Sequence, residues 1–306
     1  MLFRSQILML AAMAAIASSG TSLFAADPEL VAVGNPGNKA DSTGFGEVGY
    51  EYRIGKVEVS NDQYAEFLNA VAVKDDKYKL YNAHMSGDKN GEDGYCGIDR
   101  TGDAGNYKYT VKAGRGKKPV NYVSWIDAVR YVNWLSNGKG AADTETRPYV
   151  IKDGKATPPD HAKLAAGAET KWVLPTENEW YKASYYDANK AGGAGYWKYA
   201  TKSDTAPSAS NVGGTTANQA NFNTDEPSEG GALSGSASAY GTFDQNGNMW
   251  EWNENNKNSR AGLRGGSFFL NDNTDHLSSG VRYDVPAGVE YSNYGFRVAA
   301  VGAAKK

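Results

Sequence analysis

The sequence predicts an α+β domain with few long elements, and three observations lead to this prediction. Three short amphipathic segments each begin with a residue that can cap a helix. Long polar connections, residues 77–118, 137–171 and 187–238, lie between and after these segments. From Tyr240 onward, short apolar pieces alternate with turn residues, which indicates strands and hairpins. Connections of this length within one domain are unusual and often carry function.

The three helical segments are SNDQYAEFLNAVA from Ser60, SWIDAVRYVNWLS from Ser124 and TENEWYKASYY from Thr176. In the first and the third, Gln or Glu follows the hydroxyl residue by three positions, which is the pattern of a capping box. In the second segment the partner is Asp, a weaker version because its side chain is shorter. The helices are short and amphipathic, so each should pack with one face against a larger structure.

The rest of the chain divides into a lead-in, one domain and a tail. Residues 26–45 are rich in Gly, Pro and Asn, and we expect them to form an irregular lead-in. From Gly46 the pattern tightens, and the run EYRIGKVEVS alternates in the manner of a strand. We expect a single domain over residues 46–302 and a short tail over residues 303–306.

Residues 1–25 have the pattern of a secretory signal peptide. Arg4 gives a positive start, residues 7–16 are apolar, and the small residues before Asp27 offer cleavage after Ala25 or Ala26. The apolar run is short for a membrane span, although an uncleaved anchor remains an alternative. Because no second run of spanning length follows, we expect a secreted or periplasmic protein without a membrane span after cleavage.

Charge and cysteine content exclude several classes of function. The chain has 32 basic and 35 acidic residues, a net charge of −3, and loss of Arg4 with the signal peptide makes it −4. This balance gives no basic surface for nucleic acid and no polybasic membrane patch. Cys96 is the single cysteine, so neither an internal disulfide nor a cysteine-rich zinc site can form. It is either a buried thiol or a redox or cross-linking thiol.

Four phrases, in this order and with appropriate gaps, resemble the sulfatase-modifying-factor superfamily, whose founding member is the formylglycine-generating enzyme. They are KPVNYVSWIDAVRYVNWLS, WVLPTENEWYKASYY, YGTFDQNGNMWEWNEN, and LRGGSFF with the later YGFRVAA. The run GKVEVSNDQYAEFLNAV is similar to the family's opening strand and helix. The resemblance covers roughly residues 46–300. It implies a compact, loop-rich fold related to C-type lectins, with short helices around an irregular antiparallel sheet.

The resemblance does not extend to the family's catalytic centre. The founding enzyme oxidises a substrate cysteine with two active-site cysteines and copper, and soft thiolates suit Cu(I). The matching positions here are Leu270 and Asp275, or Thr274 if the gap is placed earlier. The sequence therefore does not support copper. Ser267 and Trp250 match pocket positions of the enzyme and could line a remaining cleft.

The sulfoxide-synthase branch of the superfamily uses iron held by histidines. This chain has three histidines, none at the spacing of a helical metal site, and we expect them to be polar surface or loop residues. His276 is the best functional candidate among them because of its place in the sequence near the matched pocket.

A polar rim follows the matched pocket and favours binding. It comprises Asn273, His276, Arg282, Tyr283 and Asn293, next to Ser267, and such side chains adapt to peptides or sugars by hydrogen bonds and stacking. We therefore expect a module that binds a peptide or glycan ligand. The alternatives are a solvated loop, or a formylglycine-generating-type oxidoreductase or sulfatase-maturation helper with a non-standard active site.

The run DQNGNMWE predicts a structural calcium site. Asp244 and Glu251 supply carboxylates, and the resemblance adds the carbonyls of Gly247 and Met249, a set of hard oxygens that suits calcium. The resemblance implies a second site with Asn221 and the carbonyl of Phe222, whose downstream aspartate has no clear match. The alternative is an Asn/Gly turn between strands, with tryptophans packed below it.

Overall fold

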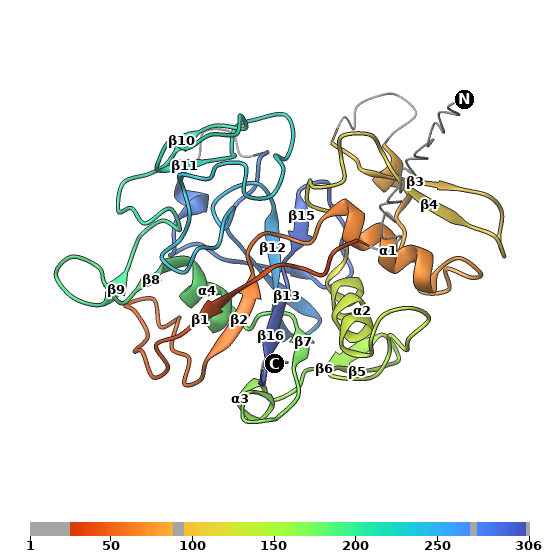
Figure 1. Ribbon diagram of the computed structural model, residues 1–306, viewed down its shortest axis with the longest axis horizontal. Coiled ribbons are helices and arrows are strands. Elements are labelled where there is room, and N and C mark those ends of the chain that lie inside the picture. Colours follow the sequence, from red (N-terminus) through yellow and green to blue (C-terminus); the bar gives the residue numbers. More distant parts are fainter. Residues whose placement is uncertain (1–24, 88–94, 270–273, 304–306) are drawn as a thin grey trace, which may run out of the picture.

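The computed structural model describes residues 25–87, 95–269 and 274–303 (Figure 1). Two four-stranded sheets lie at its centre. The first has the order β1 (Leu30–Val33), β2 (Tyr52–Gly55), β16 (Ala299–Val301) and β7 (Lys171–Val173), and all its pairs are antiparallel. The second has the order β14 (Tyr283–Pro286), β13 (Arg260–Arg264), β12 (Trp250–Lys257) and β15 (Tyr294–Phe296), in which β12 and β15 are parallel.

Short helices flank these sheets. In Figure 1, α1 and α2 lie on one side of the central strands and α4 lies on the other. Four two-stranded pairs occupy the connections. The helices are α1 (Asn61–Val71), α2 (Trp125–Ser136), α3 (His161–Ala165) and α4 (Glu177–Tyr185), with 3-10 turns η1 (Ala83–Ser86) and η2 (Thr274–Leu277). The pairs are β3 (Ile98–Thr101) with β4 (Lys108–Val111), β5 (Val150–Lys152) with β6 (Lys155–Thr157), β8 (Tyr186–Asp187) with β9 (Gly195–Tyr196), and β10 (Ser208–Ala209) with β11 (Gln219–Ala220).

This architecture confirms the predicted loop-rich α+β fold, and the three helix starts have the predicted chemistry. Ser60 and Thr176 each form a complete capping box, in which the residue three positions later also accepts from the cap backbone. Ser124 accepts from the backbone of Asp127, but the reciprocal bond to the cap is not formed. The difference follows from side-chain length, because the shorter Asp carboxylate bonds to the Ser124 hydroxyl instead, at 2.5 Å.

The lead-in is less irregular than expected. Leu30–Val33 forms β1, which pairs along its full length with β2. The local sequence is a short apolar run, and pairing with β2 gives its backbone groups the partners that an isolated run lacks. The prediction relied on the glycines and prolines on either side of this run and therefore missed the strand.

Packed aromatic rings in the core join the first two helices to the second sheet. Tyr64 on α1 stacks on Tyr131 on α2 with ring centroids 6.1 Å apart, and both rings contact Phe296 on β15 edge-on. All three side chains are buried. This contact fixes the helices against the second sheet, where the candidate site lies.

Candidate functional site

The residues of the predicted rim surround Trp250, which begins β12. The ring of Tyr283, at the start of β14, meets the Trp250 ring edge-on with centroids 5.1 Å apart. His276 in η2 lies 6.1 Å from the same ring, and its Nε2 is 3.2 Å from the Tyr283 hydroxyl. Asn293 accepts a backbone hydrogen bond from Trp250. The structure thus places Tyr283, His276 and the backbone of Asn293 next to Trp250.

Three aromatic side chains in the segments that carry the predicted rim are exposed. Phe269, Tyr283 and Tyr291 are 61%, 42% and 54% exposed. Among the described residues, the other large hydrophobic side chains exposed to this degree are Val150 and Val212, which are aliphatic. We use the term aromatic rim for Phe269, His276, Tyr283, Tyr291 and Asn293.

Two predicted rim residues belong to the framework instead. Ser267 is fully buried, and its Oγ accepts from the amide of Asn293 at 3.1 Å. Arg282 donates to Glu177 at 2.7 Å and forms two 2.8 Å bonds with Asp284. These groups already have their partners, so we assign them to positioning rather than to ligand contact. Trp250, only 6% exposed, is a packing surface beneath the rim.

The positions that correspond to the family's cysteines fall partly outside the described residues. Leu270 lies outside them, as does Asn273 of the predicted rim. Thr274 and Asp275 begin η2, where Asp275 is exposed and accepts a backbone bond from Ser278. Neither side chain is a thiol, and Cys96 is buried elsewhere in the chain.

The predicted calcium loop makes the required turn. Gly247 has φ +79°, and a Cβ there would lie 2.1 Å from the carbonyl oxygen of Asn221, so only glycine fits. Asp244 also has a positive φ, 63°. One of its carboxylate oxygens accepts from the backbone of Gly231 at 2.6 Å. Burial raises the pKa of Asp244 to about 6, even though this bond and Arg297 favour the charged form.

Glu251, the second predicted carboxylate ligand, forms an ion pair. Its two oxygens each receive an N–H of Arg297 at 2.6 Å, and one of them also accepts from the indole of Trp180 at 2.8 Å. Both Glu251 and Arg297 are fully buried. Sequence analysis missed Arg297 because it lies in YGFRVAA, far from the loop it contacts.

A third carboxylate, Glu58, joins this group from the segment after β2. It is 3% exposed, and its Oε1 accepts from the amide of Asn248 at 2.9 Å. Its Oε2 has no hydrogen-bond partner among the described residues. Burial, then the charges of Asp244 and Glu251, raise the pKa of Glu58 well above its ordinary range. We call Glu58, Asp244, Glu251 and Arg297 the loop cluster.

Asn221, which belongs to the second predicted calcium site, forms hydrogen bonds within the protein. The amide of Asn221 donates to the carbonyl of Glu226 at 3.1 Å, and its oxygen accepts from the hydroxyl of Thr224 at 2.5 Å. The backbone of Asn221 also bonds to Asn248 in the first loop. The side chains of Asn221 and Phe222 are both buried. Asn221 therefore supports the first loop in this structure.

A further buried network surrounds His161, which sequence analysis placed on the surface or in a loop. His161 is 4% exposed and begins α3. Its Nδ1 lies 3.0 Å from both oxygens of Glu179, and its Nε2 lies 2.8 Å from Glu254. Burial by itself lowers the pKa of His161, but the two carboxylates outweigh this and raise it to about 10.

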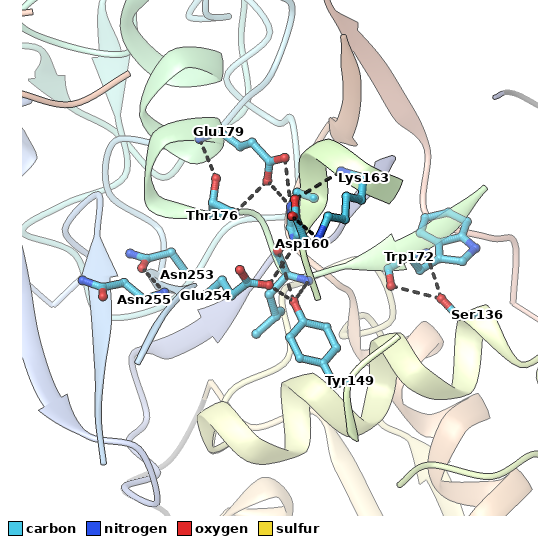
Figure 2. A network of polar contacts seen from close by, with 12 residues as sticks. Ser136, Tyr149, Asp160, Lys163, Trp172, Thr176, Glu179, Asn253, Glu254 and Asn255 are labelled. Atoms are coloured by element: carbon cyan, nitrogen blue, oxygen red, sulfur yellow. Dashed lines mark hydrogen bonds and ion pairs between the residues drawn. The ribbon is translucent and has the colours of Figure 1, made fainter. Parts of the chain in front are cut away.

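The carboxylates of this network have additional donors. Figure 2 shows Glu254 facing the hydroxyl of Tyr149, at 2.5 Å, and Glu179 next to its capping partner Thr176. Tyr50 donates to Glu179 at 2.9 Å. We call His161, Glu179, Glu254, Tyr149 and Tyr50 the histidine network. Its residues lie in separate elements, so no local sequence signal identifies it.

The described part of the chain contains no cluster of three His, Cys, Asp or Glu side chains arranged to hold a metal ion. The predicted calcium site has two carboxylates and two carbonyls, so this finding does not address it. Within the described ranges, no helix is both long and apolar enough to cross a membrane.

Comparison with known proteins agrees with this fold. The family described as "Sulfatase-modifying factor enzyme 1-like domain" matches residues 39–301. The chain is similar to the structure titled "Crystal Structure of CarF", with 22% identity, coverage of 89% of this chain and 98% of that chain, and a TM-score of 0.53. At this identity the similarity shows the fold alone.

Two other solved structures are similar over comparable lengths. Treponema denticola variable protein 1 shares 18% identity and covers 88% of this chain and 94% of its own, with a TM-score of 0.49. PvdO from Pseudomonas aeruginosa shares 17% identity, with coverage of 90% and 92% and a TM-score of 0.42. A search of curated proteins finds no match.

Proposed function

Because the chain belongs to the sulfatase-modifying factor enzyme 1-like family, we propose that it is a calcium-stabilised binding domain with that family's fold. Its ligand is a peptide or a glycan, and its binding face is the aromatic rim. The observation that carries this proposal is the exposure of Phe269, Tyr283 and Tyr291, of which Tyr283 packs edge-on against the buried Trp250. Aromatic residues are enriched at interfaces and among the residues that contribute most to binding.

The geometry of the rim suits recognition more than catalysis. Tyr283 is held by its contact with Trp250, so it offers a rigid ring at low entropic cost. His276 and Asn293 add polar groups beside it. Together they combine stacking surface with hydrogen-bonding groups, which is the combination that sugar rings and peptide side chains require.

The same proposal predicts that the protein is not a copper-dependent oxidase. Thr274 and Asp275 cannot supply the thiolates that Cu(I) requires, and Leu270 is an aliphatic residue. Copper-treated protein, incubated with a cysteine-containing sulfatase-motif peptide and oxygen, should leave the peptide mass unchanged. Catalytic conversion of that cysteine to an aldehyde would refute the binding proposal in this form.

The residues of the first loop fit a calcium ion in their chemistry. The loop cluster places the buried carboxylates of Glu58 and Glu251 and the partly buried one of Asp244 around one guanidinium, and one oxygen of Glu58 has no partner among the residues that the structure describes. Buried negative charge of this kind requires a proton or a cation. The carboxylates of Asp244 and Glu251 and the carbonyls of Gly247 and Met249 would hold the ion. Bound calcium supplies structural cross-linking of this loop, and we assign it no catalytic step.

Export through the predicted signal peptide completes the proposal, because calcium is available to secreted and periplasmic proteins at concentrations that weak sites require. N-terminal sequencing of the protein from a secreting host should show cleavage after Ala25 or Ala26. A protein that retains Met1 in that host would contradict export by cleavage.

Alanine substitution of exposed rings tests the binding face. The probes are a glycan array and a peptide array, screened with wild-type protein and with the Tyr283→Ala and Tyr291→Ala variants. Loss of an anchoring ring should weaken binding by 2 kcal/mol or more, about 30-fold, while the melting temperature changes little. Val212→Ala, which removes an exposed side chain outside the rim, is the matched control. Equal binding by all variants would place the site elsewhere.

A further inference from the structure

The loop cluster carries more negative charge than its own cation can neutralise. Arg297 is the basic group within it, and the charges of Glu251, Glu58 and Asp244 all act on its guanidinium. One positive and three negative groups leave a net charge of −2 if every carboxylate is ionised. Since Glu58, Glu251 and Arg297 are buried and Asp244 is partly buried, solvent screens this excess only weakly.

Glu251 is the carboxylate that bonds directly to the guanidinium of Arg297. The two side chains form two parallel hydrogen bonds of 2.6 Å, the geometry in which guanidinium and carboxylate interact most strongly. The remaining N–H groups of Arg297 bond to main-chain carbonyls of Gly55 at 2.9 Å and Phe243 at 2.8 Å. Little of the guanidinium is left for the other two carboxylates.

Glu58 and Asp244 therefore lack a full counter-charge. Each has one donor, the amide of Asn248 for Glu58 and the backbone of Gly231 for Asp244. The backbone of Phe243 bonds to the carbonyl of Lys56 at 2.8 Å, which aligns the two segments that carry these carboxylates. Glu58 Oε2 is the buried oxygen for which the described residues offer no partner.

We propose that Glu58 and Asp244 form the carboxylate pair that holds the calcium ion, and that Glu251 serves as the counter-ion of Arg297. This inference rests on the proposed calcium site and changes its ligand set. Two anionic oxygens, supplemented by the carbonyls of the loop, are the hard ligands that calcium prefers. Glu58 lies far from Asp244 in the sequence, so the ion would join the segment after β2 to the loop before β12.

A competing position exists next to Asp244. A cavity of about 10 Å³, room for roughly one water-sized particle, borders Asp244 and Asn246 but not Glu58. An ion held there would use the predicted loop without Glu58. The experiment must therefore separate a site that contains Glu58 from one that does not.

Calcium titration of chelator-treated full-length protein provides this separation. The readouts are the melting temperature against free calcium and terbium luminescence, which a nearby indole sensitises; Trp180 contacts Glu251. Glu58→Gln should weaken calcium binding at least tenfold and reduce the terbium signal. In chelator, its melting temperature should equal or exceed that of the wild type, because a buried carboxyl whose ionisation burial and the neighbouring carboxylates disfavour has been removed. Asp244→Asn should weaken binding similarly.

Asp127→Asn is the matched control. Asp127 is a buried carboxylate whose pKa burial raises to about 7, and its partners are Ser124 and Arg130, outside the cluster. This variant should keep the wild-type calcium response. If Glu58→Gln fails to fold, Glu58→Asp, which retains the charge but shortens the side chain, should fold and bind calcium more weakly.

The outcomes distinguish the inference from the proposed function. A wild-type calcium response in Glu58→Gln together with its loss in Asp244→Asn would overturn the role of Glu58 and keep the calcium loop. An equal fall in melting temperature with and without calcium would make Glu58 purely structural. Wild-type protein that binds neither calcium nor terbium would refute the inference and the calcium site, while binding by the aromatic rim would stand or fall by its own test.

Discussion

The histidine network and the loop cluster are both buried groups of charges, but they differ in how completely the protein satisfies them. In the histidine network, Glu179 and Glu254 each receive at least two donors, and His161 bonds through both ring nitrogens. In the loop cluster, Glu251 is fully satisfied, whereas Glu58 retains an oxygen without a partner in the described part of the chain.

This difference indicates which cluster needs a ligand. A buried polar network is stable by itself only when every member has its hydrogen bonds. The histidine network meets this condition and so acts as a structural junction of α3, α4 and β12. The loop cluster meets this condition only partly, and we expect its stability to depend on a proton or a cation taken up from the solution.

Among the substitutions in these two clusters, removal of Arg297 should lower the free energy of unfolding the most. Arg297→Gln leaves the buried carboxylates of Glu58 and Glu251 without a cation, and breaking a buried pair costs about 3–5 kcal/mol. Equilibrium urea unfolding of the two proteins measures this change. The double variant with Glu251→Gln should recover part of the loss, since one orphaned charge is removed with its partner. A loss under about 1 kcal/mol would show that the pair is not the main support of this cluster.

The histidine network should make stability depend on pH in the alkaline range. His161 has a pKa raised to about 10 in the folded state, against about 6.5 when unfolded. Its contribution is complete below pH 6.5 and is lost as pH rises toward 10, because the folded state binds the proton more tightly. Denaturation at several pH values should therefore show a decline that His161→Gln lacks.

His84→Gln is the control for this profile. His84 lies in η1 and is exposed, so its replacement should leave the pH dependence unchanged. A decline of equal slope in wild type and His161→Gln would mean that His161 is not the group that titrates.

Loss of a single donor in the histidine network should have the smallest effect. Tyr149→Phe removes the hydroxyl that donates to Glu254 and accepts from the backbone of Leu174 at 3.1 Å. Hydrogen bonds to charged groups contribute about 1.5–3 kcal/mol to stability. Because His161 still bonds to Glu254 in this variant, the loss of unfolding free energy should lie near the lower limit. Thermal unfolding measures it. A loss larger than that of Arg297→Gln would reverse our ranking of the two clusters.

Local features could be predicted from the sequence, and contacts between distant segments could not. The capping boxes at Ser60 and Thr176 depend on residues three positions apart, so their pattern is visible in the sequence. The turn at Gly247 was equally visible. Glu58 and Arg297 approach the loop only because three segments far apart in the chain align there, and no spacing rule connects them. His161 was missed because its partners are 18 and 93 positions away.

The central place of β16 has a consequence for the kinetics of folding. This strand lies between β2 and β7, so residues near position 54 obtain their partner only when Ala299 is available. At a synthesis rate of ~5–20 residues per second, roughly 12–50 s separate the two strands as they leave the ribosome. Until then the inner edge of β2 has no strand to pair with. Contacts over such separations also slow folding itself. Late completion of the first sheet would suit the export that we propose, because a chain that has not yet folded can still be translocated.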